Sequence, residues 1–179
     1  MTNPVDPQTG EIDYELAISL DAEDLAEGGI GQAYEELKGE LASRGVQPWE
    51  LVELLDDAAG TYRVACGRGE YPIYGPHAEL NSWGLAAFAL FDIVNRQLQD
   101  SEIRLFALNG GNDLFGIFMT SAQAEHARQH LEHKSDWPYL PTLEPDWYGA
   151  FHDEKGQQEQ VRPAQSRFGW LPGRARKRG

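Results

Sequence analysis

The sequence has only one cysteine, Cys66, so no disulfide can form within the chain. A single free thiol is typical of proteins from a reducing compartment. No apolar run approaches the roughly 20 residues that a membrane-spanning helix needs. The N-terminus also lacks the basic and apolar segments of a signal peptide. We therefore expect a cytoplasmic protein that does not associate with membranes.

Catalytic sequence patterns are also missing. The chain has no G-x-S-x-G nucleophile motif, no H-E-x-x-H zinc motif and no G-x-G-x-x-G dinucleotide motif. Cys66 would share a strand face with Tyr62 and Val64, which is typical of a small buried hydrophobe and not of an exposed nucleophile. We therefore expect no catalytic residue of a recognised class and no cofactor.

Positive charge is scarce and unevenly distributed. The 15 Lys and Arg residues stand against 29 Asp and Glu residues, a formal net charge of −14. Residues 155–179 hold seven basic residues and one acidic residue, so they carry +6 and the preceding residues carry −20. Such an acidic body repels nucleic-acid phosphates and attracts basic proteins. We expect a basic protein partner and no direct binding of nucleic acid; the alternative is that the acidity only maintains solubility.

Helical periodicity is clearest in the first third of the chain. Residues 30–45 place Ile30, Tyr34 and Leu37 on one helical face, and Gly45 fits the helix end. Residues 47–57 are expected to form a second helix with Pro48 in its first turn. The acidic outer faces of this helix pair provide the first predicted partner-binding residues: Glu36, Glu40, Glu53 and Asp57.

The rest of the domain predicts two β-hairpins and two helices. Alternating apolar residues indicate strands over 61–66 and 70–75, with Pro72 restricting the second to a sheet edge, and over 103–108 and 114–119. Ser82 is expected to cap a helix over 82–99 that is apolar on nearly every side, and so buried between a sheet and the first helix pair. Thr120 and Gln123 fit a capping box that begins a helix over 121–133.

These elements predict the α+β class, with an antiparallel sheet built from two β-hairpins and packed with helices in the order α-α-β-β-α-β-β-α. Residues 1–18 are expected to form a loose arm with room for a short edge strand. Residues 19–152 would form a single α+β domain. Residues 153–179 would form a polar, basic and disordered tail.

The stretch Asn109-Gly110-Gly111-Asn112-Asp113 lies between the strands of the second hairpin. A phosphate-binding loop would normally lead into a helix and carry a nearby lysine. Here a strand follows, and Asp113 would repel an anion. We interpret the stretch as a hairpin turn, and Asn109, Asn112 and Asp113 as a loop candidate for contact with a partner.

Three histidines, His126, His130 and His133, raise the possibility of a metal site. His126 and His133 would be about 10 Å apart along a helix, which is too far for both to bind one ion. Their side of the helix is opposite the apolar positions, so we expect them to face solvent and predict no metal site.

Residues 136–152 form a proline- and aromatic-rich strap. Its large aromatic residues are expected either to pack over the sheet and complete the core, or to form part of an interface, where Trp and Tyr are frequent hot spots. The predicted partner-binding residues of the strap are Trp137, Tyr139, Trp147 and Tyr148.

Size, charge and the lack of catalytic motifs together favour a non-enzymatic acidic binding protein that captures a basic protein. In these features the chain resembles the bacterial immunity proteins that neutralise toxins, a likeness of class that transfers no residue. One alternative is a DNA-mimicking inhibitor of a nucleic-acid-binding protein. Another is an enzyme of unrecognised type with its site near the turn at residues 109–113.

Overall fold

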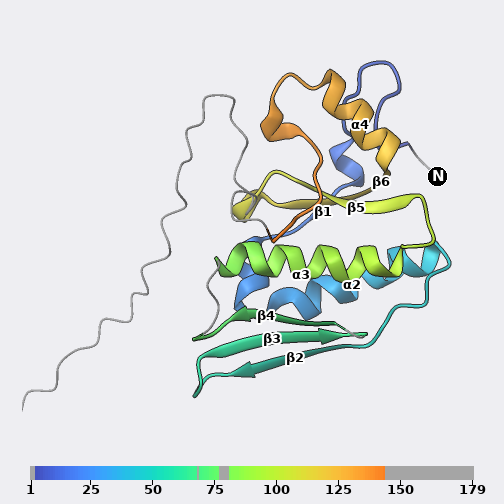
Figure 1. The fold of residues 1–179 in the computed structure, drawn as a ribbon. Coiled ribbons are helices and arrows are strands. Elements are labelled where there is room, and N and C mark those ends of the chain that lie inside the picture. Colours follow the sequence, from blue (N-terminus) through green and yellow to red (C-terminus); the bar gives the residue numbers. More distant parts are fainter. Residues whose placement is uncertain (1–2, 68, 77–80, 144–179) are drawn as a thin grey trace, which may run out of the picture.

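Two three-stranded antiparallel sheets lie on either side of a pair of helices (Figure 1). The computed structural model describes residues 3–67, 69–76 and 81–143. One sheet has the order β2-β3-β4, with bounds Leu51–Asp56, Thr61–Cys66 and Gly69–Tyr74. The other has the order β1-β6-β5, with bounds Ile18–Ser19, Phe115–Thr120 and Ile103–Leu108. The predicted α+β class is confirmed, and the two hairpins lie in separate sheets.

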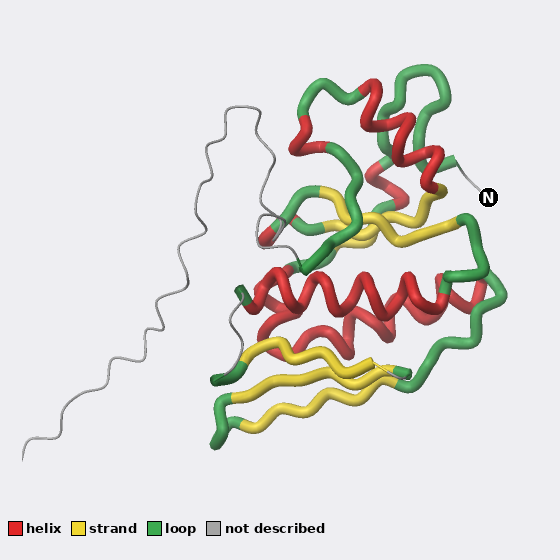
Figure 2. The backbone as a smooth tube through the Cα atoms, viewed as in Figure 1, coloured by secondary structure: helices red, strands yellow, loops and turns green. Residues whose placement is uncertain are grey.

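Helices α2 (Ile30–Ser43) and α3 (Ser82–Gln97) form the layer between the sheets, and α4 (Ser121–His130) lies beyond the sheet of β1, β6 and β5 (Figure 2). The short helical elements are α1 (Ala22–Asp24), the π-helical turn η2 (Leu25–Gly29), and the 3-10 turns η1 (Tyr14–Leu16), η3 (Gly111–Asp113) and η4 (Lys134–Asp136). Within the described residues, no helix is long and apolar enough to cross a membrane.

The second predicted helix is wrong: residues 51–56 form strand β2. All six of its residues pair in register with β3, from Leu51 with Cys66 to Asp56 with Thr61. The stretch has leucine or valine at four of six positions, on both faces of the strand, so its sequence also satisfies a helical spacing. Pairing with β3 decides between the two, because β-structure depends on tertiary partners more than on local preference.

Helix α3 is buried as predicted, although its neighbours differ from the expectation. It lies between two sheets beside α2, instead of between one sheet and a helix pair (Figure 1). The side chain of Asn95 joins it to β5: Nδ2 donates to the Leu105 carbonyl at 2.9 Å and Oδ1 accepts from the Leu105 N–H at 2.7 Å. The N-cap is Asn81, one residue before the predicted Ser82, and it accepts from the Trp83 N–H.

The N-terminal segment, expected as a loose arm, makes defined contacts with α4. Val5 is buried and pairs with Ile12 in an isolated β-bridge. Gln123 of α4 donates a hydrogen bond to Asn3 at 2.7 Å. The edge strand lies later than predicted, at β1, where Ile18 pairs with Gly116.

The second hairpin forms as predicted. Strands β5 and β6 pair from Ile103 with Thr120 to Leu108 with Phe115. In the turn, Asn109 and Gly111 have positive φ angles of 56° and 62°, whereas Gly110 is extended. The predicted capping box of α4 is present, because Thr120 and Gln123 each accept a hydrogen bond from the backbone N–H of the other. Helix α4 ends at His130, three residues before the predicted end.

Candidate interaction surface

The most exposed apolar strand in the described chain is β2. Four large apolar side chains on or just before it are between 37% and 49% exposed, although most residues of their kind lie in the core. Single exposed apolar residues are common, but neighbouring ones mark interaction surfaces. We call this group the β2 surface: Trp49, Val52, Leu54 and Leu55.

Both faces of β2 contribute to the β2 surface. Val52 and Leu54 lie on the face turned away from the helices, where their cross-strand neighbours are Ala65 and Arg63. Leu55 lies on the helix side, beside Gly28, where an added Cβ would be in ordinary van der Waals contact with the leucine at 3.4 Å. The β2 surface therefore continues around the edge of the sheet from one face to the other.

Trp49 is held firmly at the start of β2. Its backbone N–H donates to Oε1 of Gln97 at 2.8 Å, and its carbonyl accepts from the hydroxyl of Tyr34 at 3.0 Å. The indole ring packs against Gly67, where an added Cβ would lie only 2.5 Å from the ring. Two backbone hydrogen bonds and this close packing keep Trp49 in place while more than a third of the residue stays exposed.

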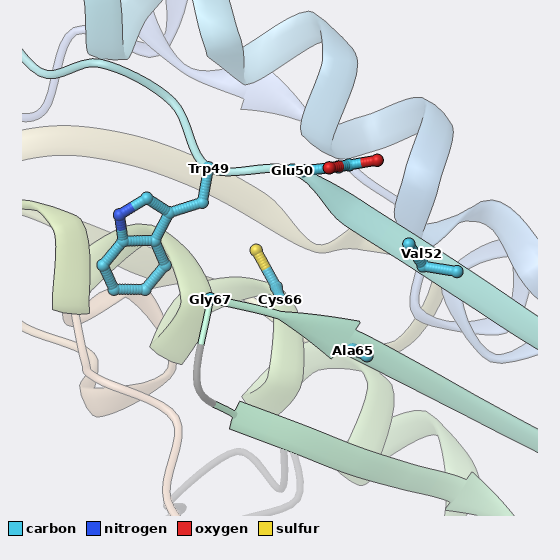
Figure 3. A pocket seen from close by; sticks show the side chains of 6 residues that line it. All are labelled: Trp49, Glu50, Val52, Ala65, Cys66 and Gly67. Atoms are coloured by element: carbon cyan, nitrogen blue, oxygen red, sulfur yellow. The ribbon is translucent and has the colours of Figure 1, made fainter.

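A shallow hollow of about 340 Å³ adjoins Trp49 (Figure 3). Its walls come from the residues that begin β2 and end β3, and they are Trp49, Glu50, Val52, Ala65, Cys66 and Gly67. Cys66 is buried, and burial raises the pKa of its thiol, so the sulfur is protonated near neutral pH. The hollow offers an apolar wall and one carboxylate, which suits a side chain of a partner better than a reaction.

Acidic residues stand at both ends of the β2 surface. Glu50 precedes β2, Asp56 is its last residue and Asp57 follows it; all three are exposed. Asp56 also accepts a hydrogen bond from the Ala59 N–H in the turn that follows, at 3.0 Å. The nearest basic side chain on the outer face of this sheet, Arg63, is paired with Glu70 at 2.9 Å. The surface thus has an apolar centre with a negative rim.

Glu53 was predicted on the exposed face of a helix, but it lies on a strand and points toward α2. It lies on β2 and is half-buried, and its Oε1 accepts hydrogen bonds from the Gly31 N–H at 2.9 Å and from the Tyr62 hydroxyl. Burial, together with this hydrogen bond, raises the pKa of Tyr62. Because Gly31 is in the first turn of α2, the carboxylate also meets the positive end of the helix dipole. Glu53 stabilises the junction of β2 and α2.

The other three predicted acidic residues, Glu36, Glu40 and Asp57, do not lie together on one face. Asp57 adjoins the β2 surface, whereas Glu36 and Glu40 are exposed on α2. Glu40 forms an ion pair with Arg44, whose guanidinium lies 4.1 Å from the centre of the Phe118 ring on β6. Glu40 therefore belongs to the side of α2 that faces the other sheet.

The described part of the strap covers the edge of β5. Tyr139 pairs with Ala107 through two backbone hydrogen bonds of 2.7 and 2.9 Å, and its hydroxyl donates to the Asn109 carbonyl at 2.6 Å. Burial raises the pKa of Tyr139 to about 12. The indole N–H of Trp137 donates to the Leu131 carbonyl. Trp147 and Tyr148 lie outside the described residues.

The loop candidate for partner contact, Asn109, Asn112 and Asp113, lies in the turn between β5 and β6 and makes few contacts with charged groups. Nδ2 of Asn112 lies 3.4 Å from the Glu23 carboxylate, and Asp113 is exposed. None of these turn residues lines the hollow beside Trp49. The turn and the β2 surface are therefore separate sites.

The histidines of α4 form a local pair. The His126 and His130 rings are 4.2 Å apart at their centres, and Nδ1 of His130 lies 2.9 Å from the His126 carbonyl. His133 and His130 are exposed, and His126 is half-buried. Among the described residues, no three His, Cys, Asp or Glu side chains form a group that could hold a metal ion.

Sequence reasoning missed the β2 surface because it assigned those residues to a helix. The available signal was the run Leu51-Val52-Glu53-Leu54-Leu55, which has too many apolar residues for a strand with one buried face.

No protein-family model matches the chain, and comparisons with curated proteins and with solved structures find no match. The function is therefore argued from the surface itself.

Proposed function

We propose that this protein is a non-enzymatic binding protein that captures a basic protein partner through the β2 surface. One observation carries the proposal: exposed apolar side chains follow a sheet edge, and carboxylates stand at both of its ends. An apolar centre within a polar rim is the usual anatomy of a protein interface. The rim here is acidic, so a basic partner fits it.

The two parts of the surface have different roles in capture. Burial of Trp49, Val52, Leu54 and Leu55 would provide binding energy, because it removes apolar surface from water. Trp49 would be the main anchor, since tryptophan is frequent among interface hot spots. Glu50 and Asp57 would attract the partner and orient it during encounter, an effect that weakens as salt screens the charges. Glu36 and Glu40 on α2 would add to the negative potential at longer range.

In character this function is similar to that of bacterial immunity proteins, which bind and neutralise a toxin. The hollow beside Trp49 would receive one side chain of the partner. We place this binding in the cytoplasm, since the only cysteine of the chain is an unpaired thiol.

The test is capture from a lysate of the source cells on the immobilised full chain, followed by association measurements with the purified partner. The double variant Glu50→Lys with Asp57→Lys should reduce the association rate about tenfold or more at low salt. The matched control is Glu11→Lys with Glu15→Lys, which makes the same change in net charge on the N-terminal segment. That segment lies at the opposite end of the molecule from β2 (Figure 1).

The proposal requires the captured protein to be basic and the two variants to differ. Raising the salt concentration should slow association of the wild type and bring its rate close to that of the double variant. Equal rates for the two charge variants would show that net charge alone matters and would reject the β2 surface as the binding site.

A further inference from the structure

The four outer edges of the two sheets differ in how well they are protected. An exposed edge strand offers unpaired backbone N–H and C=O groups to any other extended chain, and proteins normally block it. The edge at β4 carries Pro72, which has no N–H to donate, and a register shift where β4 meets β3. The edge at β1 is only two residues long, Ile18–Ser19.

The third edge, at β5, is covered by the strap, where Tyr139 pairs with Ala107. The fourth edge is β2, and none of these devices protects it. It is six residues long, contains no proline, lysine or arginine, and pairs with β3 without a bulge. No strand of the described chain lies on its other side, as Figure 1 shows. A charged side chain that points inward can also protect an edge, but the one on β2, Glu53, accepts hydrogen bonds from Gly31 and Tyr62 and does not block the edge.

We propose that β2 binds its partner by strand addition: an extended segment of a basic protein pairs with the free edge of β2 and becomes a fourth strand of that sheet. This inference rests on the proposed function and specifies its mode of binding. Backbone hydrogen bonds to an edge strand provide affinity in this mode, and alternate side chains provide specificity.

The exposed side chains define the segment that fits. On the outer face of the sheet its side chains would lie beside Val52 and Leu54, and on the helix side beside Leu55, so both faces favour apolar residues. At its two ends it would meet Glu50 and Asp57, which favour Lys or Arg. The partner segment is therefore extended, apolar in its middle and basic at both ends.

A second copy of this chain fits the same edge poorly. Directly opposite residues of an antiparallel pair point to the same face of the sheet, so symmetric pairing centred on Glu53 would place Glu50 of each copy opposite Asp56 of the other. Like charges directly opposite each other destabilise a strand pair. The charges at the ends of β2 thus select a basic partner and oppose self-association through this edge.

The probe for the test is a fluorescent peptide with two lysines at each end and alternating valine and threonine between them. Its affinity for the full chain is measured by fluorescence anisotropy, and its site is located by hydrogen exchange. We expect slower exchange over residues 50–57 in the complex, because strand addition protects the free N–H groups of β2. Two isomeric peptides provide a second measurement. In one the odd-numbered backbone nitrogens are methylated, and in the other the even-numbered ones, so each peptide has one edge whose N–H groups are blocked. The peptide that turns its blocked edge to β2 loses hydrogen bonds, so at least one of the two should bind about tenfold more weakly than the parent.

Variants of the protein provide an independent check. Val52→Thr with Leu54→Thr gives both positions a β-branched residue, which suits a strand, but removes apolar surface, and should weaken peptide binding about tenfold. Leu16→Thr, at a position 38% exposed in η1, is the matched control and should leave binding unchanged. A folded double variant that binds as tightly as the wild type would overturn the proposal.

The remaining outcomes separate this inference from the proposed function. If both methylated peptides bind as well as the parent, or protection falls elsewhere, strand addition is wrong, although electrostatic capture can still stand. A peptide with glutamates in place of the lysines tests the charge: equal binding would contradict the proposed basic partner whatever the exchange data show. A concentration-dependent dimer of the free protein that protects β2 would assign the edge to a second copy and overturn the inference.

Discussion

The carboxylate of Glu53 lies 2.9 Å from the backbone nitrogen of Gly31, and this hydrogen bond joins strand β2 to the first turn of α2. The contact requires close approach, since a Cβ added to Gly31 would lie 2.3 Å from the other carboxylate oxygen. It fixes β2, the strand that carries the exposed apolar residues, against the helix layer. An acidic residue predicted to bind a partner therefore helps to hold the β2 surface in place.

Replacing Glu53 should destabilise the fold. Glu53→Ala leaves the Gly31 N–H and the Tyr62 hydroxyl without their acceptor, and we expect a loss of about 1–3 kcal/mol. Glu53→Gln keeps an acceptor oxygen and should lose less. Glu36→Ala, which removes an exposed carboxylate from α2, should stay within about 0.5 kcal/mol of the wild type. Urea unfolding of the three variants measures the difference, and equal losses for Glu53→Ala and Glu36→Ala would contradict this role.

The outcome for β2 shows where reasoning from the sequence stops. Helix α3, the strands of both hairpins and the capping box of α4 could be predicted, because each has a local pattern that only one structure satisfies. The run from Leu51 to Leu55 fits both a helix and a strand, and the choice depends on β3 as a partner. The hydrogen bond between Glu53 and Gly31 depends in turn on that choice, so its role could not be predicted either.

The core prediction concerns Phe91 of α3, which is 1% exposed and lies between the two sheets. Phe91→Ala should cost about 3–5 kcal/mol, the usual range for a buried aromatic side chain whose cavity cannot fully close. The measurement is again the free energy of unfolding in urea. A loss below about 1 kcal/mol would show that α3 is not the centre of the core.

Two glycines should respond to alanine in opposite directions. Gly111 has a φ angle of 62° and open space around it, so Gly111→Ala strains the backbone without a clash and should cost about 1 kcal/mol. Gly39 lies inside α2, also with open space, and Gly39→Ala should stabilise by about 0.5–1 kcal/mol. Thermal unfolding of both variants checks the signs; a stabilising Gly111→Ala would contradict the turn geometry.

The sequence predicted less of the candidate site than of the fold. Its acidic character follows from composition, and Asp57 does adjoin the β2 surface. The sequence could not show that three sheet edges are blocked and one is free. Pro72 did predict the edge position of β4, but the rest of the distinction depends on contacts between distant residues, such as Tyr139 with Ala107.

The last prediction concerns alkaline pH and Tyr139. Burial raises the pKa of this hydroxyl from 10.0 to about 12, so the folded chain favours its neutral form. Below pH 10 the group is protonated in both states, so its contribution to stability does not change with pH. Above pH 10 the unfolded tyrosine loses its proton while the folded one keeps it. Stability should therefore fall as pH rises from 10 to 12, and the contribution of this group levels off above that.

Comparison with Tyr139→Phe isolates this contribution, because other buried tyrosines such as Tyr34 also have a raised pKa. Near neutral pH the variant should be less stable by about 1 kcal/mol, since it loses the hydrogen bond to the Asn109 carbonyl. Between pH 10 and 12 the wild type should lose up to about 1.4 kcal/mol more per pH unit than the variant. Urea unfolding at a series of pH values measures both slopes. Parallel slopes would show that Tyr139 ionises alike in the folded and unfolded chain, and that the strap does not bury its hydroxyl at the edge of β5.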